Sequence, residues 1–312
     1  MPKRKLIDAG MSSSGWSRIG TYMKCPQLFA YQRRLGLKLI SADALTRGSM
    51  GHVIQAHQHA IWGAKQGGVW VDDEWVEDPD VFLPPEEAIV AYCDEHGGYD
   101  HLDRMLETFR RYMAQYPEPP GRVVAVEYPV SAMLGYVDRK WGLWVEKEGR
   151  FIQPTPLNSP GHPKHGQPIR LTRRLDLAVG DRNGRVAIWD HKHQARVQPN
   201  RSVDAYAIDG GFGAFRLMGR QLYPDFGGVI VNLIQTTENW RVARRAVPPT
   251  PHRDNHLADL IWRAEHDLAR LDTEEIDHWH WPKAMHETAC YGRYGKCSGL
   301  DLCSFGKSVL DR

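Results

Sequence analysis

The sequence predicts an α/β protein in which helices flank a central mixed β-sheet. Two observations predict this class. The first 120 residues carry mainly helical patterns, whereas short apolar segments with the period of strands follow from residue 123. The hairpin signal Asp181-Arg-Asn-Gly184 joins two of these segments, and a helix-forming stretch over 202–222 precedes a further strand.

Local patterns define the elements in chain order. Pro26 fits the first position of a helix, and the run from Pro117 to Gly121 ends the first helical block. An acidic loop is expected over 69–85. Helices are expected over 17–24, 26–34, 44–66, 86–96, 100–116, 202–222 and 254–272. Strands are expected over 123–130, 143–145, 175–179, 186–189 and 229–235.

Length and charge limit the function. The 312 residues allow one large domain or two small ones. The chain has 40 basic and 38 acidic residues, which gives a net charge of +2. This charge excludes a positive field over the whole surface, so any nucleic-acid binding has to come from a local basic patch. No apolar stretch approaches the roughly 18 to 20 residues that span a bilayer. We therefore expect a soluble, cytoplasmic protein without a membrane partner.

The hairpin carries the most informative chemistry. In a strand, Asp190 and Lys192 project from the same face, and the turn brings Asp176 alongside Asp190. Two carboxylates can hold Mg²⁺ or Mn²⁺, and the bound metal activates a water molecule. The lysine can orient this water or contact a phosphate. The alternative for a bare Asp-x-Lys is a surface salt bridge. A second copy, Asp138-Arg-Lys140, is less favoured because it runs into Trp141-Gly-Leu-Trp144 and then a Pro-rich loop. The later copy follows a clean apolar strand after the hairpin and precedes a helix candidate.

Four motifs in order define a resemblance that covers residues 17–305. They are Ser17-Arg-Ile-Gly-Thr-Tyr22-Met-Lys-Cys25-Pro26, Arg47-Gly48-Ser-Met-Gly51-His52, Asp176, and Asp190-His-Lys192. In this order and spacing the chain resembles the RecB-like branch of the PD-(D/E)XK nuclease superfamily. The resemblance implies a restriction-endonuclease-like core and a metal-dependent DNA nuclease, an exonuclease on single-stranded DNA or DNA ends.

The resemblance also implies the roles of site residues. The metal ligands carried over are His52, Asp176, Asp190 and the backbone carbonyl of His191, with Lys192 as the catalytic lysine. Glu127 is either a supporting group behind the ligands or an edge charge. His57 and His59 are interpreted as structural or surface residues. The family's Gln-x-x-x-Tyr motif falls at Gly211 and Phe215, where neither residue matches, although Tyr206 or Gln221 are candidate substitutes.

The cysteines resemble those of the iron–sulfur subgroup of this branch, which includes CRISPR-adaptation exonucleases and AddB-type nucleases. One early cysteine, Cys25, accompanies Cys290, Cys297 and Cys303, and a four-iron cluster needs four thiolates. The cluster would be structural, because hydrolysis needs no electron transfer. Zinc in the same four sites and unligated thiols are the alternatives. Cys93 is expected to be a buried apolar side chain.

The chain is expected to divide into a tail and one domain. Residues 1–15 are expected to form a flexible tail and 16–312 a single nuclease domain. This domain would hold a helical insertion over 53–122, the core sheet and its helix over 123–235, and a C-terminal helix with a cysteine-clipped tail over 250–312.

Some of the basic clusters are expected to line a channel for DNA, and the alternative for any one cluster is solvated surface charge. These clusters lie at 3–5, 33–34, 170–174 and 241–245, near the aromatic residues Tyr31, Trp240 and Trp262. The alternative function is a nucleic-acid-binding protein on the same fold that cleaves weakly or not at all, with zinc in the cysteine site.

Overall fold

The computed structural model describes residues 4–7, 15–37, 43–146, 151–274, 277–284, 290–292 and 295–305. The chain forms two compact units. Unit 1 comprises Met1–Ser12, Asp43–Ser131 and Thr172–Asp254, and unit 2 comprises Ser13–Ala42, Ala132–Leu171 and Asn255–Arg312. The predicted division into a tail and one nuclease domain stays a prediction. In the part of the chain that the structure describes, no helix is long and apolar enough to cross a membrane.

The main sheet is mixed, which confirms the predicted fold class. Its main path runs β2 (Glu74–Val76), β1 (Val69–Val71), β3 (Arg122–Val137), β6 (Arg170–Gly180), β7 (Val186–Gln194), β8 (Phe226–Gln235) and β9 (Val242–Val247). Parallel pairs of neighbouring strands, β1 with β3 and β7 with β8, occur beside antiparallel pairs such as β6 with β7.

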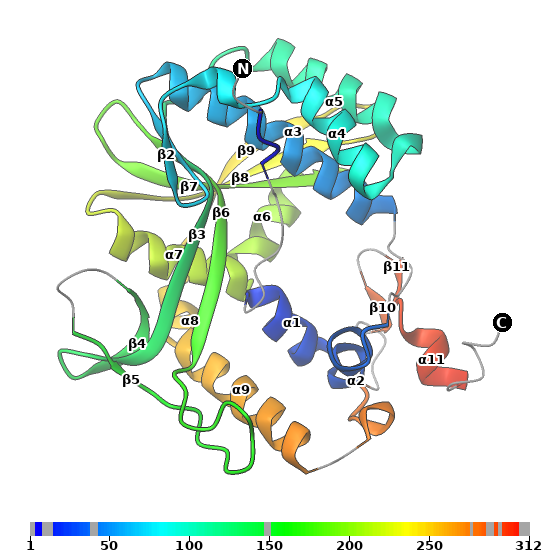
Figure 1. Ribbon diagram of the computed structural model, residues 1–312, viewed down its shortest axis with the longest axis vertical. Coiled ribbons are helices and arrows are strands. Elements are labelled where there is room, and N and C mark those ends of the chain that lie inside the picture. Colours follow the sequence, from blue (N-terminus) through cyan, green and yellow to red (C-terminus); the bar gives the residue numbers. More distant parts are fainter. Residues whose placement is uncertain are drawn as a thin grey trace. The chain divides into compact units, whose positions relative to one another are not determined.

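One face of the sheet in unit 1 is covered by α3 (Asp43–Lys65), seen in blue in Figure 1. Ala56, Ala60 and Ala64 recur every four residues, so these small side chains form one helix face that packs on the sheet. Their buried neighbours include Val69, Leu177, Val179 and Trp189. The helices α4 (Pro85–His96) and α5 (Leu102–Gln115) join α3 through a second apolar cluster.

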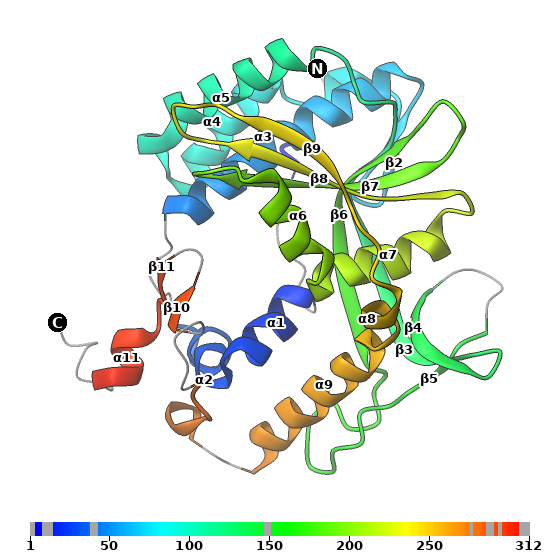
Figure 2. The ribbon, with the colours of Figure 1, turned by 180° about the vertical axis from the view of Figure 1, so that it is seen from behind.

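The opposite face of the sheet carries α7 (Gly210–Leu222), visible with α6 (Pro199–Ala207) in Figure 2. Ile188 points away from the α3 face because its neighbour Trp189 points toward it. An added Cβ at Gly219 of α7 would overlap Phe226 and meet Ile188, so this glycine allows close packing of helix on sheet.

The single helix predicted over 202–222 is wrong, because Asp209 interrupts it. The side chain of Asp209 accepts hydrogen bonds from the backbone amides of Gly211 (2.8 Å) and Phe212 (3.3 Å) and so caps the start of α7. The loop predicted over 69–85 is also wrong in part. It holds the β1–β2 hairpin, which turns at Asp72 with a φ of 55°, and a short 3-10 helix over Pro79–Val81.

Unit 2 holds α1 (Trp16–Lys24), α2 (Pro26–Phe29), a π-helical turn (Ala30–Arg34) and α9 (Leu257–Thr273). The end of β3 pairs there with β4 (Lys140–Val145) and β5 (Gln153–Pro154). Unit 2 also holds a 3-10 helix (His278–His280), β10 (Tyr291–Gly292), β11 (Gly295–Lys296) and α11 (Leu300–Phe305). The short helix α8 (Pro251–Asn255) lies mainly in unit 1.

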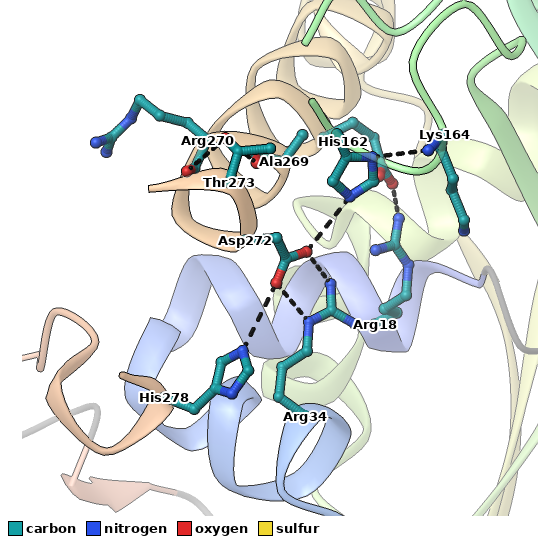
Figure 3. A network of polar contacts seen from close by, with 10 residues as sticks. Arg18, Arg34, His162, Lys164, Ala269, Arg270, Asp272, Thr273 and His278 are labelled. Carbon is teal, nitrogen blue, oxygen red and sulfur yellow. Dashed lines mark hydrogen bonds and ion pairs between the residues drawn. The ribbon is translucent and has the colours of Figure 1, made fainter. Parts of the chain in front are cut away.

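Asp272 at the end of α9 is the centre of a polar network in unit 2 (Figure 3). Its carboxylate accepts two hydrogen bonds from Arg34, of 2.8 Å from Nε and 2.5 Å from Nη2. Nε2 of His162 lies 3.6 Å and Nε2 of His278 lies 3.9 Å from the same carboxylate. One carboxylate thus ties four segments of unit 2 together.

Candidate active site

The predicted Asp-x-Lys motif lies on β7, where the strand continues past the apolar run that predicted it. The antiparallel ladder of β6 and β7 runs to Leu177 and Trp189, so Asp176 and Asp190 are the next residues on the two strands. Nζ of Lys192 lies 2.6 Å from Oδ2 of Asp190, and Asp190 is buried while Lys192 reaches solvent in part. The two strands therefore bring both carboxylates and the lysine to one place, as the hairpin predicted.

His52 of α3 joins this group. Nδ1 of His52 lies 3.3 Å from Oδ2 of Asp176, and the backbone N–H of His191 donates a 2.8 Å hydrogen bond to the same oxygen. The close approach of α3 to β7 depends on Gly51, because an added Cβ there would overlap the imidazole ring of His193. The predicted histidine thus reaches the acidic hairpin across a contact that only glycine permits.

Glu127 lies closer to this group than the sequence indicated. One ligand atom each from His52, Glu127 and Asp176 lies within 4.8 Å of the other two. Since two ligands of a cation bound at about 2.1 Å are at most about 4.2 Å apart, this donor set of one imidazole and two carboxylates fits a divalent cation after small adjustments. Asp190 is turned toward Lys192, and the carbonyl of His191 as a ligand stays a prediction.

The backbone is strained at Glu127, which has a φ of 47° although it lies within β3. Arg174 holds it in place: Nε donates a 3.0 Å hydrogen bond to the carbonyl of Glu127 and lies 3.4 Å from its Oε2. Arg174 also forms an ion pair with Asp72 in the β1–β2 turn. The positive φ breaks the alternation of the strand, so the period of the sequence could not place this carboxylate.

The surroundings of the site shift the pKa values of Asp176 and Lys192. Burial, and then the negative charge of Asp190, raise the pKa of Asp176, while His52 opposes the shift. Burial by itself would lower the pKa of Lys192, but Asp190 and Asp176 raise it above its ordinary value. Lys192 is therefore a cation at neutral pH, and it donates hydrogen bonds rather than accepting a proton.

Two buried histidines, His59 on α3 and His191 on β7, lie next to the site. The rings of His59 and His191 stack at 5.1 Å, and Nδ1 of His191 lies 2.9 Å from Nδ2 of Asn232. Burial lowers the pKa of His59 to about 4 and that of His191 well below its ordinary value. Both rings are neutral at pH 7, so they add no positive charge that would repel a cation. His59 and His57 are buried, which excludes the surface interpretation.

Comparison with known families decides the relationship. Residues 15–304 match the PD-(D/E)XK nuclease superfamily. The chain belongs to the PD-(D/E)XK nuclease superfamily. Members of this superfamily are nucleases that typically use divalent metals, and the fold class predicted for it is confirmed. No curated protein matches the chain.

The superfamily's Asp-x-Lys pattern occurs twice, and the structure separates the two copies. Asp138 and Arg139 have φ values of 49° and 64°, which are typical of the two central residues of a tight hairpin turn. Val137 and Lys140 are the paired residues that flank this turn between β3 and β4. The earlier copy is thus a turn, whereas Asp190 and Lys192 lie on a central strand of the nuclease core.

Cys303, one of the four cysteines predicted to hold a cluster, interacts electrostatically with two of the others in unit 2. Burial raises the pKa of the Cys303 thiol, the side chain of Tyr31 lowers it, and Cys25 and Cys297 raise it. The fourth is tied to this group, since the N–H of Cys297 donates a 2.6 Å hydrogen bond to the carbonyl of Cys290.

Several basic residues predicted to contact DNA are engaged within the protein. Lys5 lies 3.2 Å from Glu74, and Arg170 lies 2.6 Å from Glu146. The guanidinium of Arg244 lies 3.5 Å from the ring centre of Tyr116. These contacts use part of the positive charge of the basic clusters within the protein itself.

Proposed function

We propose that the chain is a metal-dependent deoxyribonuclease that hydrolyses phosphodiester bonds and acts as an exonuclease on single-stranded DNA or DNA ends. The observation that carries this proposal is the arrangement of His52 and Asp176, 3.3 Å apart, beside the 2.6 Å pair of Asp190 and Lys192. Membership of the PD-(D/E)XK superfamily supports the same reaction class.

In this proposal two of the carboxylates, Asp176 and Glu127, are oriented before any metal binds. A bound Mg²⁺ or Mn²⁺ supplies an activated water and offsets charge on the phosphate. His52, Asp176, Asp190 and the carbonyl of His191 hold the cation, with Glu127 as a further carboxylate. The amide of His191 fixes Asp176, and Arg174 fixes Glu127, so little reorganisation is needed on binding.

Lys192 acts as a hydrogen-bond donor. Its raised pKa keeps the ammonium protonated, so it orients the attacking water or binds a phosphate oxygen and does not remove a proton. Asp190 beside it balances its charge and limits where the ammonium points.

A cleavage assay tests the proposal. Purified protein is incubated with end-labelled DNA and Mg²⁺ or Mn²⁺, with Lys192→Ala as the variant. Lys140→Ala is the matched control, because Lys140 belongs to the Asp-x-Lys copy that forms a turn. We expect chelator-sensitive cleavage by the wild type and the control, and a loss of about 100-fold or more in Lys192→Ala. Equal cleavage by all three proteins would refute the proposed site.

The preference for single strands is supported by aromatic side chains near the site. Trp70 and Trp75 are exposed, and the ring of Trp70 lies 6.3 Å from that of Tyr128, the residue after Glu127. Exposed rings stack with the unpaired bases of a single strand. The test compares linear and circular single strands, duplexes with labelled 5′ or 3′ ends, and RNA. An exonuclease leaves circles intact, and cleavage of circles would indicate an endonuclease.

We further propose that Cys25, Cys290, Cys297 and Cys303 hold a structural 4Fe-4S cluster. The electrostatic interaction of Cys303 with Cys25 and Cys297 in unit 2 supports this assignment. Protein purified without oxygen should be brown and contain about four iron and four sulfide ions per chain. Cys303→Ser should lose iron, whereas Cys93→Ala, a change in the apolar core of unit 1, should keep it. A colourless protein with one zinc ion would overturn the assignment.

A second candidate function is nucleic-acid binding without cleavage. The residues Gly211 and Phe215, at the positions of the family's Gln-x-x-x-Tyr motif, favour it. Metal-independent binding with no cleavage of any substrate would support this candidate. Chelator-sensitive cleavage that is lost in Asp190→Ala would exclude it.

A further inference from the structure

A positively charged side chain from the sheet lies over each of two aromatic rings of α7. The guanidinium carbon of Arg173 on β6 lies 4.0 Å from the ring centre of Phe215, and Nζ of Lys192 on β7 lies 5.9 Å from that of Phe212. The two rings are 6.0 Å apart and nearly perpendicular. Arg173 and Lys192 therefore approach the candidate active site over the same pair of rings.

The fold leaves donors of Arg173 unused. Its Nε is buried and has no hydrogen-bond partner among the residues that the structure describes. Over the same residues, no carboxylate lies within 4.0 Å of its guanidinium, although Asp190, Asp176 and Asp209 are its electrostatic neighbours. The next residue, Arg174, differs, because it contacts both Glu127 and Asp72.

We propose that Arg173 is a substrate-binding residue that donates hydrogen bonds to a backbone phosphate of the nucleic acid beside the metal site, with Phe215 holding its guanidinium plane. This inference rests on the proposed function and deepens it. A planar guanidinium matches two phosphate oxygens at once, and stacking on a ring fixes its orientation before binding. The carboxylates nearby keep the charge in place without using its donors.

The same geometry accounts for the changed helix motif. By position, Phe215 stands where the family has the tyrosine of Gln-x-x-x-Tyr, and Gly211 stands where it has the glutamine. A phenylalanine and a glycine offer no side-chain donor. Arg173 supplies donors from the neighbouring strand, and Phe215 keeps the ring as their support.

The test measures binding rather than cleavage. Fluorescence anisotropy of a labelled 20-nucleotide single strand is recorded with Ca²⁺ in place of Mg²⁺, from 50 to 300 mM salt. Each phosphate contact to a single strand contributes about 0.7 to the slope of log affinity against log salt concentration. We expect Arg173→Gln to weaken binding about tenfold and to lower the slope by about 0.7.

Three further variants separate charge from geometry. Arg173→Lys keeps the charge and should restore the slope but not the full affinity, since an ammonium lacks the planar fork. Phe215→Leu should weaken binding with an unchanged slope. Arg185→Gln is the matched control, because it removes an exposed arginine that pairs with Asp181 in the β6–β7 turn, and it should bind as the wild type does.

The outcomes are distinguishable from those of the cleavage assay. A thermal unfolding transition first shows that Arg173→Gln is folded. If this variant then binds with the wild-type affinity and slope, or if the wild type binds no nucleic acid, the inference is overturned. If the wild type binds but cleaves nothing, while Arg173→Gln loses affinity and slope, the inference stands and the proposed nuclease function fails.

Discussion

Nδ1 of His52 lies 3.3 Å from Oδ2 of Asp176, and this pair joins α3 to the central sheet. The same oxygen accepts a hydrogen bond from the backbone N–H of His191. The carboxylate of Asp176 on β6 is therefore held by both a helix and the adjacent strand. The imidazole and the carboxylate both belong to the candidate cation site.

The first prediction concerns the helix that carries His52. Gly51→Ala should lower metal-dependent cleavage at least tenfold, because the added methyl group overlaps the ring of His193 and displaces α3 from β7. Gly48→Ala is the matched control: an added Cβ meets nothing within 4 Å there, and alanine favours a helix by up to about 1 kcal/mol. Activity and thermal stability are measured for both. Equal activity of the two variants would show that the contact is unimportant.

The second prediction concerns Glu127. Glu127→Gln should weaken Mn²⁺ binding and cleavage by about 10- to 100-fold, whether the carboxylate binds the cation or orients its ligands. Glu146→Gln, which removes an exposed carboxylate paired with Arg170, is the control and should behave as the wild type. Isothermal titration with Mn²⁺ checks both. Wild-type affinity in Glu127→Gln would remove this residue from the site.

The third prediction concerns pH. His57 is buried, and its Nε2 accepts a 2.9 Å hydrogen bond from the backbone N–H of Ile7. Burial lowers the pKa of His57 to about 4. Because the unfolded chain keeps the ordinary value of about 6.5, it binds more protons than the folded chain between these values. The free energy of unfolding therefore falls as pH drops from about 6.5 to about 4, by up to about 3 kcal/mol from this residue.

Urea unfolding at several pH values tests this dependence. His57→Gln should remove this share of the acid sensitivity, even if it is less stable at pH 7. His96→Gln, a change at an exposed histidine at the end of α4, should keep the wild-type pH profile. Identical profiles for wild type and His57→Gln would contradict the assignment.

The fourth prediction concerns a buried ion pair in unit 1. Arg216 on α7 donates hydrogen bonds of 2.8 and 2.6 Å to Asp254, and both side chains are buried. Arg216→Met should lower the free energy of unfolding by about 3 to 5 kcal/mol, since it leaves Asp254 as an unpaired buried charge. The double variant Arg216→Met/Asp254→Leu should recover most of this loss. Arg220→Met, a change at an exposed residue of the same helix, should cost little; a similar loss there would refute the explanation.

The hairpin and its chemistry could be predicted because local signals agree there. The turn at 181–184, the apolar strands beside it and the spacing of Asp190 and Lys192 all point to one arrangement, and the structure has it. The end of β7 was less predictable, since its last residues are polar. β9 has two arginines in its centre, so it lacks the apolar pattern of a strand.

Other features depend on contacts between distant parts of the chain. The position of Glu127 follows from a positive φ and from Arg174, neither of which leaves a periodic signal. The stack of Arg173 on Phe215 joins β6 to a helix 42 positions later, and the sequence offered Arg173 only as part of a basic cluster. Such contacts are tertiary, and propensity and spacing do not contain them.

The most direct test of the central claim is a Mn²⁺ titration by calorimetry, combined with cleavage, on wild type, Asp176→Asn, Asp190→Asn and Lys192→Ala. We predict that the two asparagine variants lose at least tenfold in Mn²⁺ affinity, and that Lys192→Ala binds Mn²⁺ as tightly as the wild type or more tightly but does not cleave DNA. Wild-type Mn²⁺ affinity in both asparagine variants would contradict the account.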